Sequence, residues 1–128
     1  MKKLMILSLL MISFSAKAQS AFEKAIVVEI NKFRVENGLD TLVWSSDLYK
    51  ASTHHATWAS LADQSSHEET FSIGNLKTLK TIEDRFREYN CTGWNENIAT
   101  LYGTKARVEE AGDIVDCWER SPVHRENL

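Results

Sequence analysis

The residues of this chain that could carry out chemistry do not form a complete local motif. The stretch HEETF, residues 67–71, begins like the zinc-protease helix motif, but Phe71 stands where the second histidine ligand is required. The sequence also lacks a Cys-x-x-Cys pair, a phosphate-cradling glycine loop and a Gly-x-Ser-x-Gly nucleophile elbow. Two histidines and a glutamate around one metal ion could activate water for hydrolysis. Such a set would have to be assembled from distant parts of this chain.

The composition is that of one soluble globular domain preceded by a secretory signal. The chain has 128 residues, 43% hydrophobic and 26% charged, which excludes a disordered chain. Lys2 and Lys3 precede an apolar run from Leu4 to Phe14, and Ala-Lys-Ala follows at 16–18. The run of about 11 apolar residues is too short to span a bilayer. We therefore expect a cleavable signal peptide at 1–18 and a secreted or periplasmic mature chain, 19–128, without a transmembrane segment.

The mature chain is acidic. Removal of residues 1–18 lowers Lys+Arg from 15 to 12 against 18 Asp+Glu, a net charge of −6. Proteins that bind nucleic acids neutralise phosphates with clustered Lys and Arg, and no basic tract is present. We expect no nucleic-acid partner.

Hydrophobic spacing and capping residues predict four helices and little strand. The expected helices span about 21–37, 46–62, 79–89 and 105–121, and residues 95–102 read as a short strand or extended edge. Their expected inward residues are Leu48, Ala51, His55, Trp58 and Ala62 in the second helix, Ile82 and Phe86 in the third, and Val108, Ala111, Ile114 or Val115, and Trp118 in the fourth.

Five stretches then resemble one family in the same order along the chain. They are TWAS, SSH, DRF, GWNENIA and CWERSPVHRENL, the last of which ends the sequence. Together they resemble the CAP superfamily, also called the SCP or cysteine-rich secretory protein, antigen 5 and pathogenesis-related-1 domain, in its bacterial form. The resemblance implies an α+β fold, a three-layer α-β-α sandwich at 19–128. Relatives continue beyond the last motif, so we expect a C-terminal truncation that leaves out further strands.

The resemblance also implies a cleft in which His67, Glu96 and His124 converge. Imidazoles are common ligands of zinc, and a carboxylate can complete the shell or orient a histidine from outside it. Separations of 29 and 28 residues mean that only tertiary folding could bring the three together. Ser121 stands where many eukaryotic relatives have a second glutamate, and Val123 replaces the glycine that usually precedes the second histidine.

Each of these residues also has a purely structural interpretation. His67 could be an exposed loop residue, and Glu96 could form a buried ion pair with Arg85 or Arg125. His124 could bond backbone groups after the fourth helix. His54 and His55 are adjacent, and His55 shares a helix face with apolar residues, which favours a core position over a metal-binding role.

The two cysteines leave two alternatives open. Cys91 and Cys117 would close a loop of about 26 residues as a disulfide in an oxidising compartment, worth ~3 kcal/mol in the chain-entropy model. Two free thiols are the alternative, because two cysteines give no spacing framework to interpret.

Three functions remain compatible with the sequence. The first is a secreted module whose cleft binds a small, lipid or peptide ligand, with zinc or another divalent cation as an optional cofactor. The second is a metal-assisted hydrolase in which His67 and His124 hold the ion and Glu96 is a ligand or general base. The third is a truncated fragment without activity of its own. Whether the chain is an enzyme stays open.

The expected loss of strands generates a first prediction. Missing strands would leave an open sheet edge and uncovered apolar helix faces, which promote association. The 19–128 product should therefore be marginally stable or prone to aggregate in analytical ultracentrifugation and thermal melts. A cooperative melt of a monodisperse monomer would contradict this.

Overall fold

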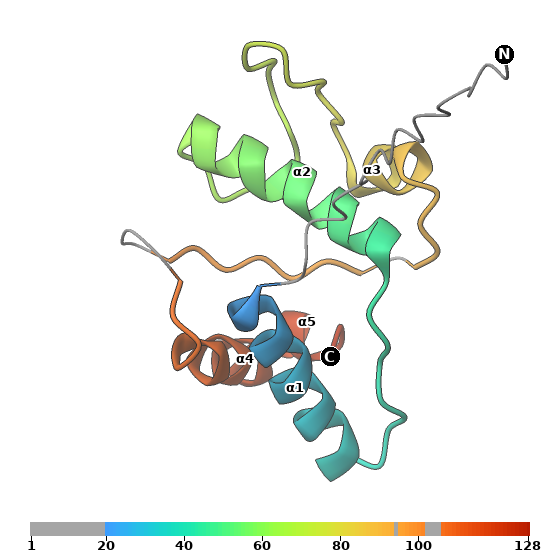
Figure 1. Ribbon diagram of the computed structural model, residues 1–128, viewed down its shortest axis with the longest axis vertical. Coiled ribbons are helices and arrows are strands. Elements are labelled where there is room, and N and C mark those ends of the chain that lie inside the picture. The colour runs from blue at the N-terminus through green and yellow to red at the C-terminus, as the bar shows by residue number, and fades with distance from the viewer. Residues whose placement is uncertain (1–19, 94, 102–105) are drawn as a thin grey trace, which may run out of the picture.

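The computed structural model describes residues 20–93, 95–101 and 106–128, so the predicted signal at 1–18 and Trp94 lie outside the described residues. The described chain forms helices, in order α1 (Ala21–Glu36), α2 (Ser46–Ala62), α3 (Ile82–Glu88), α4 (Glu110–Arg120) and α5 (Pro122–Arg125) (Figure 1). None of the helices in these ranges is long and apolar enough to span a bilayer.

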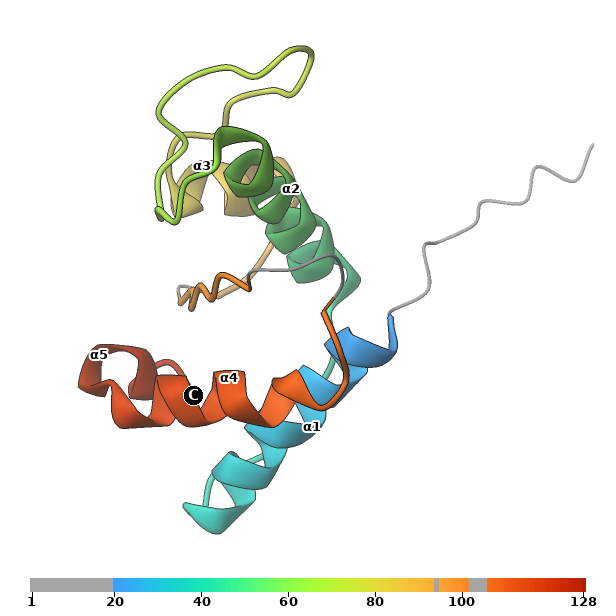
Figure 2. The ribbon, with the colours of Figure 1, turned by 90° about the vertical axis from the view of Figure 1, so that its left-hand side faces the viewer.

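Two groups of helices lie on either side of an extended segment. Helices α2 and α3 form one group with the loop between them, and α1, α4 and α5 form the other (Figures 1 and 2). Residues 95–101 run between the groups without regular secondary structure. Within the described ranges the β pairing is a single bridge between Ile73 and Leu76. The helix-rich character is as expected, but the three-layer sandwich is not confirmed.

The group of α1, α4 and α5 has a small apolar core. Phe33 of α1, Val115 of α4 and Leu128 are buried together, and Ile30 and Trp118 pack against them. Burial of such side chains contributes about 1.5–3 kcal/mol each relative to exposure. The Arg125 guanidinium adds a cation–π contact, 5.5 Å from the centre of the Phe33 ring.

Helix α2 is set by local sequence. Ser45 accepts a hydrogen bond from the Leu48 N–H, so the N-cap is one residue before the expected Ser46. Ala51, His55 and Trp58 are buried, as their spacing predicted. The Trp58 indole donates to the Phe71 carbonyl at 2.9 Å, which fastens the following loop to the helix.

The third and fourth helices are shorter than predicted. Helix α3 begins after Thr81, which forms a capping box with Asp84, instead of at Leu79. The residue that α3 buries fully is Arg85, 1% exposed, whereas the expected Ile82 and Phe86 are only half-buried. Helix α4 starts at Glu110, so the predicted burial of Val108 is wrong.

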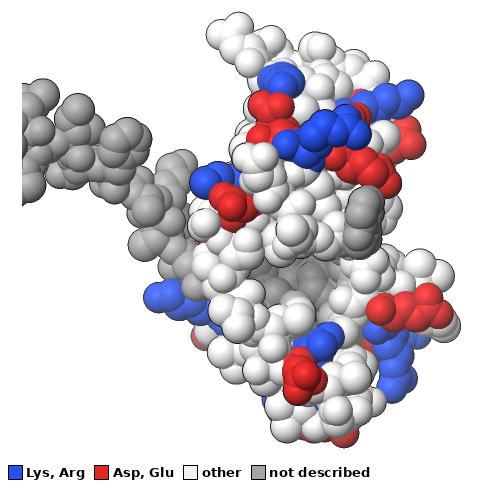
Figure 3. Space-filling model, turned by 90° about the vertical axis from the view of Figure 1, so that its right-hand side faces the viewer, with Lys and Arg blue, Asp and Glu red and all other residues white. Residues whose placement is uncertain are grey.

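Charges are mixed over the surface. On the face shown in Figure 3, Lys and Arg side chains alternate with Asp and Glu over both helical groups. No broad basic area appears on that face.

Both cysteines are free thiols, so the candidate disulfide is not present in this structure. Cys91 follows α3 and is half-buried, and Cys117 is exposed on α4. Burial raises the pKa of the Cys91 thiol above its ordinary value, and the negative charge of Asp47 raises it further, while Lys50 opposes the shift.

Replacing Asp47 should therefore make Cys91 more reactive. In a Cys117→Ser background, Asp47→Asn removes a charge that raises the Cys91 pKa, so more thiolate forms at pH 8 and alkylation by iodoacetamide should speed up roughly twofold. Mass spectrometry of the alkylated peptide measures the rate. Asp63→Asn, at the other end of α2, is the control, and equal rates in the two variants would contradict the prediction.

Candidate functional site

The structure brings together two of the three predicted site residues. His67 lies in the loop after α2, and Glu96 lies in the extended segment 95–101. The His67 Nδ1 is 2.9 Å from the Glu96 Oε1. The His67 side chain is 58% exposed and that of Glu96 is 17% exposed, so the carboxylate is shielded while most of the imidazole remains in solvent. A carboxylate on Nδ1 holds the ring in a fixed orientation and leaves Nε2 free to meet a ligand.

Arg85 of α3 fixes the position of this pair. Its Nη2 donates to both oxygens of Glu96, at 2.9 and 3.0 Å, and to the His67 carbonyl at 3.0 Å. Nη1 donates to the Leu79 carbonyl at 3.3 Å. Because Arg85 is 1% exposed, these contacts are shielded from water and are stronger than the same contacts at a surface. One buried guanidinium therefore joins α3, the preceding loop and the extended segment.

A second, buried carboxylate also lies close to the Arg85 guanidinium. Glu69 has a fully buried side chain, and its Oε1 lies 3.8 Å from the Arg85 Nη1. Glu69 Oε2 accepts from the Leu79 N–H at 2.7 Å, and Oε1 lies 3.1 Å from the His55 Nδ1. The His55 Nε2 meets the Ser66 carbonyl at 2.7 Å. The Ser66 carbonyl and the ionised Glu69 carboxylate can only accept hydrogen bonds. One proton must therefore lie between His55 Nε2 and Ser66, and a second between His55 Nδ1 and Glu69.

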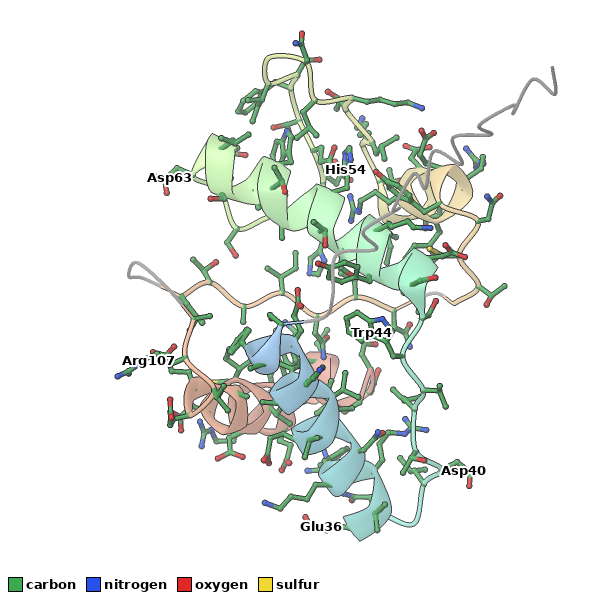
Figure 4. All side chains as sticks on the ribbon, in the orientation of Figure 1. Glu36, Asp40, Trp44, His54, Asp63 and Arg107 are labelled. Atoms are coloured by element: carbon green, nitrogen blue, oxygen red, sulfur yellow. The ribbon has the colours of Figure 1, made fainter. Side chains whose placement is uncertain are left out.

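His54 also lies on α2 (Figure 4) and approaches Glu69. Its Nδ1 bonds the Tyr89 hydroxyl at 3.1 Å. Its Nε2 is 3.4 Å from Glu69 Oε2, which is within ion-pair distance. The two atoms do not have hydrogen-bond geometry, so the contact is electrostatic only. Burial raises the pKa of Tyr89, which keeps its phenol neutral beside His54. The two adjacent histidines are thus both buried, and the predicted core position of His55 is confirmed.

His124, the third predicted residue, lies in α5 and makes other contacts. Its Nδ1 bonds the Ser121 hydroxyl at 2.8 Å, and its carbonyl accepts from the Asn97 side chain at 2.9 Å. Asn127 then bonds the Asn97 side-chain oxygen at 2.9 Å. The backbone of α5 is therefore bonded to the residue next to Glu96, while the His124 imidazole is bonded to Ser121, the N-cap residue of α5. A cleft shared by all three predicted residues stays a prediction.

In the observed arrangement, the side chains of His67, Glu96 and His124 do not form a metal-binding site. Both Glu96 oxygens are engaged by Arg85, and Oε1 also by His67. In the ranges that the structure describes, no three His, Cys, Asp or Glu side chains are grouped so as to hold an ion. Zinc and other divalent cations remain expectations from the sequence.

A groove lies beside the His67–Glu96 pair. Its volume is about 460 Å³, within the 300–1,000 Å³ usual for ligand pockets. One wall comes from α2 and the loop after it, and the other comes from the extended segment. The lining residues are Ser52, His55, Ala56, Ala59, Ser60, Asp63, Gln64, Ser65 and Glu96 to Leu101. Neither His67 nor His124 is among them.

Comparison with known proteins identifies the family. The family model described as CAP, cysteine-rich secretory protein family, matches residues 27–128, most of the chain. The chain belongs to the CAP family. Comparisons with curated proteins and with solved structures give no match.

The sequence of this CAP domain gave no indication of the role of Glu69. It sits next to Glu68 in a polar loop, and adjacent acidic residues in loops are ordinarily both exposed. Arg85 was one of two candidate partners for Glu96, and the structure selects it over Arg125. A motif cannot distinguish an exposed from a buried carboxylate when burial depends on a contact with another element.

Removing Glu69 should destabilise this CAP domain strongly. Glu69→Ala leaves Arg85 with one fewer counter-charge and leaves the His55 Nδ1 without its carboxylate partner, at a cost of about 3–5 kcal/mol. Glu68→Ala, the exposed neighbour, should stay within about 0.5 kcal/mol of the wild type. Urea unfolding followed by circular dichroism measures both. A Glu69→Ala variant as stable as Glu68→Ala would contradict the buried network described here.

Proposed function

We propose that this protein is a secreted binding module of CAP type whose groove, between α2 and residues 95–101, takes up a ligand. The observation that carries the proposal is the groove itself, about 460 Å³ in volume, with Glu96 at one end of its second wall. Family membership supports the CAP-type architecture. The basic and apolar start of the chain supports secretion or export to the periplasm.

The groove suits ligand uptake because its second wall is held in place. Glu96 is anchored by Arg85, Asn97 by α5 and the Ile98 carbonyl by the Trp118 indole at 3.2 Å. A wall fixed at three successive residues loses little conformational freedom when a ligand binds, which favours affinity. The exposed His67 ring offers a polar contact next to the groove.

The three-layer sandwich that the resemblance implies is part of this proposal. The extended segment lies between two helical groups, where the sheet of such a sandwich would lie (Figure 2). The metal-assisted hydrolase ranks below the binding module, because Glu96 is committed to Arg85 and His67.

Filling the groove should weaken ligand uptake. Ser52 and Thr53 are adjacent exposed residues of α2, and only Ser52 lines the groove. Ser52→Trp should weaken uptake of the neutral dye Nile red about tenfold, equivalent to ~1.4 kcal/mol of lost binding free energy. Thr53→Trp adds the same indole on another face of the helix and should leave uptake unchanged. Fluorescence titration measures both, and equal dye affinities in the two variants would refute the proposed site.

A further inference from the structure

Helix α1 ends at Asn37 and Gly38, the one Asn-Gly pair in the sequence. Gly38 has a φ of +71°, which favours glycine over any residue with a Cβ. Its N–H donates to the Val35 carbonyl at 3.1 Å. The Leu39 N–H donates to the Arg34 carbonyl at 2.8 Å, so the two bonds form a Schellman motif. The closure of α1 therefore depends on this Asn-Gly pair.

An asparagine that precedes glycine is open to a reaction of its own side chain. The backbone nitrogen of the glycine attacks the asparagine Cγ, and a C–N bond forms. The side-chain nitrogen leaves as ammonia and takes the amide proton with it, so a cyclic imide remains. Water then opens the imide at one of its two carbonyls and leaves aspartate or isoaspartate. Glycine favours the attack because no Cβ hinders the approach of its nitrogen.

In this structure, both reacting nitrogens are exposed to solvent but engaged by the helix. Asn37 and Gly38 are exposed residues. The leaving nitrogen, Asn37 Nδ2, donates to the Phe33 carbonyl at 2.8 Å. The attacking nitrogen, that of Gly38, is bonded to the Val35 carbonyl. Imide formation therefore requires that the end of α1 opens and that both bonds break.

The product would close α1 less well than asparagine does. An ionised carboxylate cannot donate to the Phe33 carbonyl. It also adds a negative charge beside Glu36, at the helix end where the macrodipole is negative. Isoaspartate lengthens the backbone by one carbon atom, which shifts the next two N–H groups away from their carbonyl acceptors. Both products therefore loosen the end of the helix.

The same end of α1 is bonded to a distant part of the chain. Arg34 donates through Nε to the Asp40 carbonyl and through Nη1 to the Leu128 carbonyl. Leu128 is buried in one cluster with Phe33 of α1. Glu36 and Asp40, labelled in Figure 4, lie at this end of α1 and in the turn after it. A carboxylate at position 37 competes with both carbonyls for the Arg34 guanidinium.

We propose that Asn37–Gly38 is a deamidation site, protected while the end of α1 is closed, whose conversion weakens the packing of α1 against α4. The inference goes beyond the proposed function, because it involves neither the groove nor the His67–Glu96 pair. The reaction proceeds only from molecules in which the helix end is open. The extent of conversion therefore increases with the time that this end spends open.

Isoaspartate formation tests the site directly. The purified protein is kept in mildly alkaline buffer with and without denaturing urea, and mass spectrometry with electron-transfer fragmentation quantifies isoaspartate at each asparagine. Position 37 should convert faster than Asn75, which is also exposed but precedes Leu76. Urea should speed conversion at position 37 roughly thirtyfold, because two hydrogen bonds no longer have to open. Equal rates at positions 37 and 75 in urea would overturn the site, and no effect of urea would overturn its protection.

A substitution near the helix end tests the role of opening in the folded protein. Arg34→Ala removes the bond to the Asp40 carbonyl, which lies beyond Gly38 and must break when the helix end opens. Position 37 should then convert about fivefold faster, the factor expected for one hydrogen bond. Lys32→Ala is the matched control, because Lys32 forms only an exposed ion pair with Glu29 of the same helix. Equal rates in the two variants would contradict the dependence on opening.

A carboxylate introduced directly at position 37 tests the effect on packing. Asn37→Asp loses the donor to the Phe33 carbonyl and adds charge at the helix end, so the midpoint of thermal unfolding should fall by about 4–8 °C. Asn75→Asp adds the same charge in the turn between Ile73 and Leu76 and should melt within about 1 °C of the wild type. Equal midpoints for the two variants would overturn the proposed weakening of α1.

Discussion

The structure depends on the buried guanidinium of Arg85. It contacts Glu96, Glu69 and two backbone carbonyls, and it is shielded from solvent. Taking a charge out of water costs several kcal/mol, which only close counter-charges and a full set of hydrogen bonds can offset. Arg85 has both. Because an arginine cannot release its proton at any ordinary pH, the surrounding loops must present acceptors to it in one arrangement.

This constraint explains how the long loop between α2 and α3 acquires a defined shape with few apolar residues. Leu79 is the apolar residue that this loop buries fully. Hydrogen bonds hold the remainder of the loop in place. Glu69 bonds the Leu79 N–H, and two side chains of α2 bond loop carbonyls: His55 bonds that of Ser66, and Trp58 bonds that of Phe71. Each contact connects α2 or a buried acid to loop backbone. The loop is thereby held over the two histidines of α2, with His67 at its surface.

The parts that sequence predicted well are those set by neighbouring residues. Helix α1 starts at the Ser20–Glu23 capping box, and α2 follows the spacing of its buried residues. The start of α3 was predicted too early because Leu79 directs its N–H to Glu69, ten residues away, and such a bond leaves no local signal. The His67–Glu96 contact was accessible only through the order of motifs along the chain, because no spacing rule connects residues 29 apart. Burial of Glu69 had no signal of either kind.

The extended segment 95–101 supplies Glu96 to the site and also forms one wall of the groove. Along 95–101, the Glu96 side chain reaches Arg85 in one helical group, while Asn97 and the Ile98 carbonyl bond α5 and α4 in the other. Together these three residues contact both helical groups. A ligand in the proposed groove would contact Glu96, which also contacts His67. The groove and the imidazole–carboxylate pair therefore share Glu96.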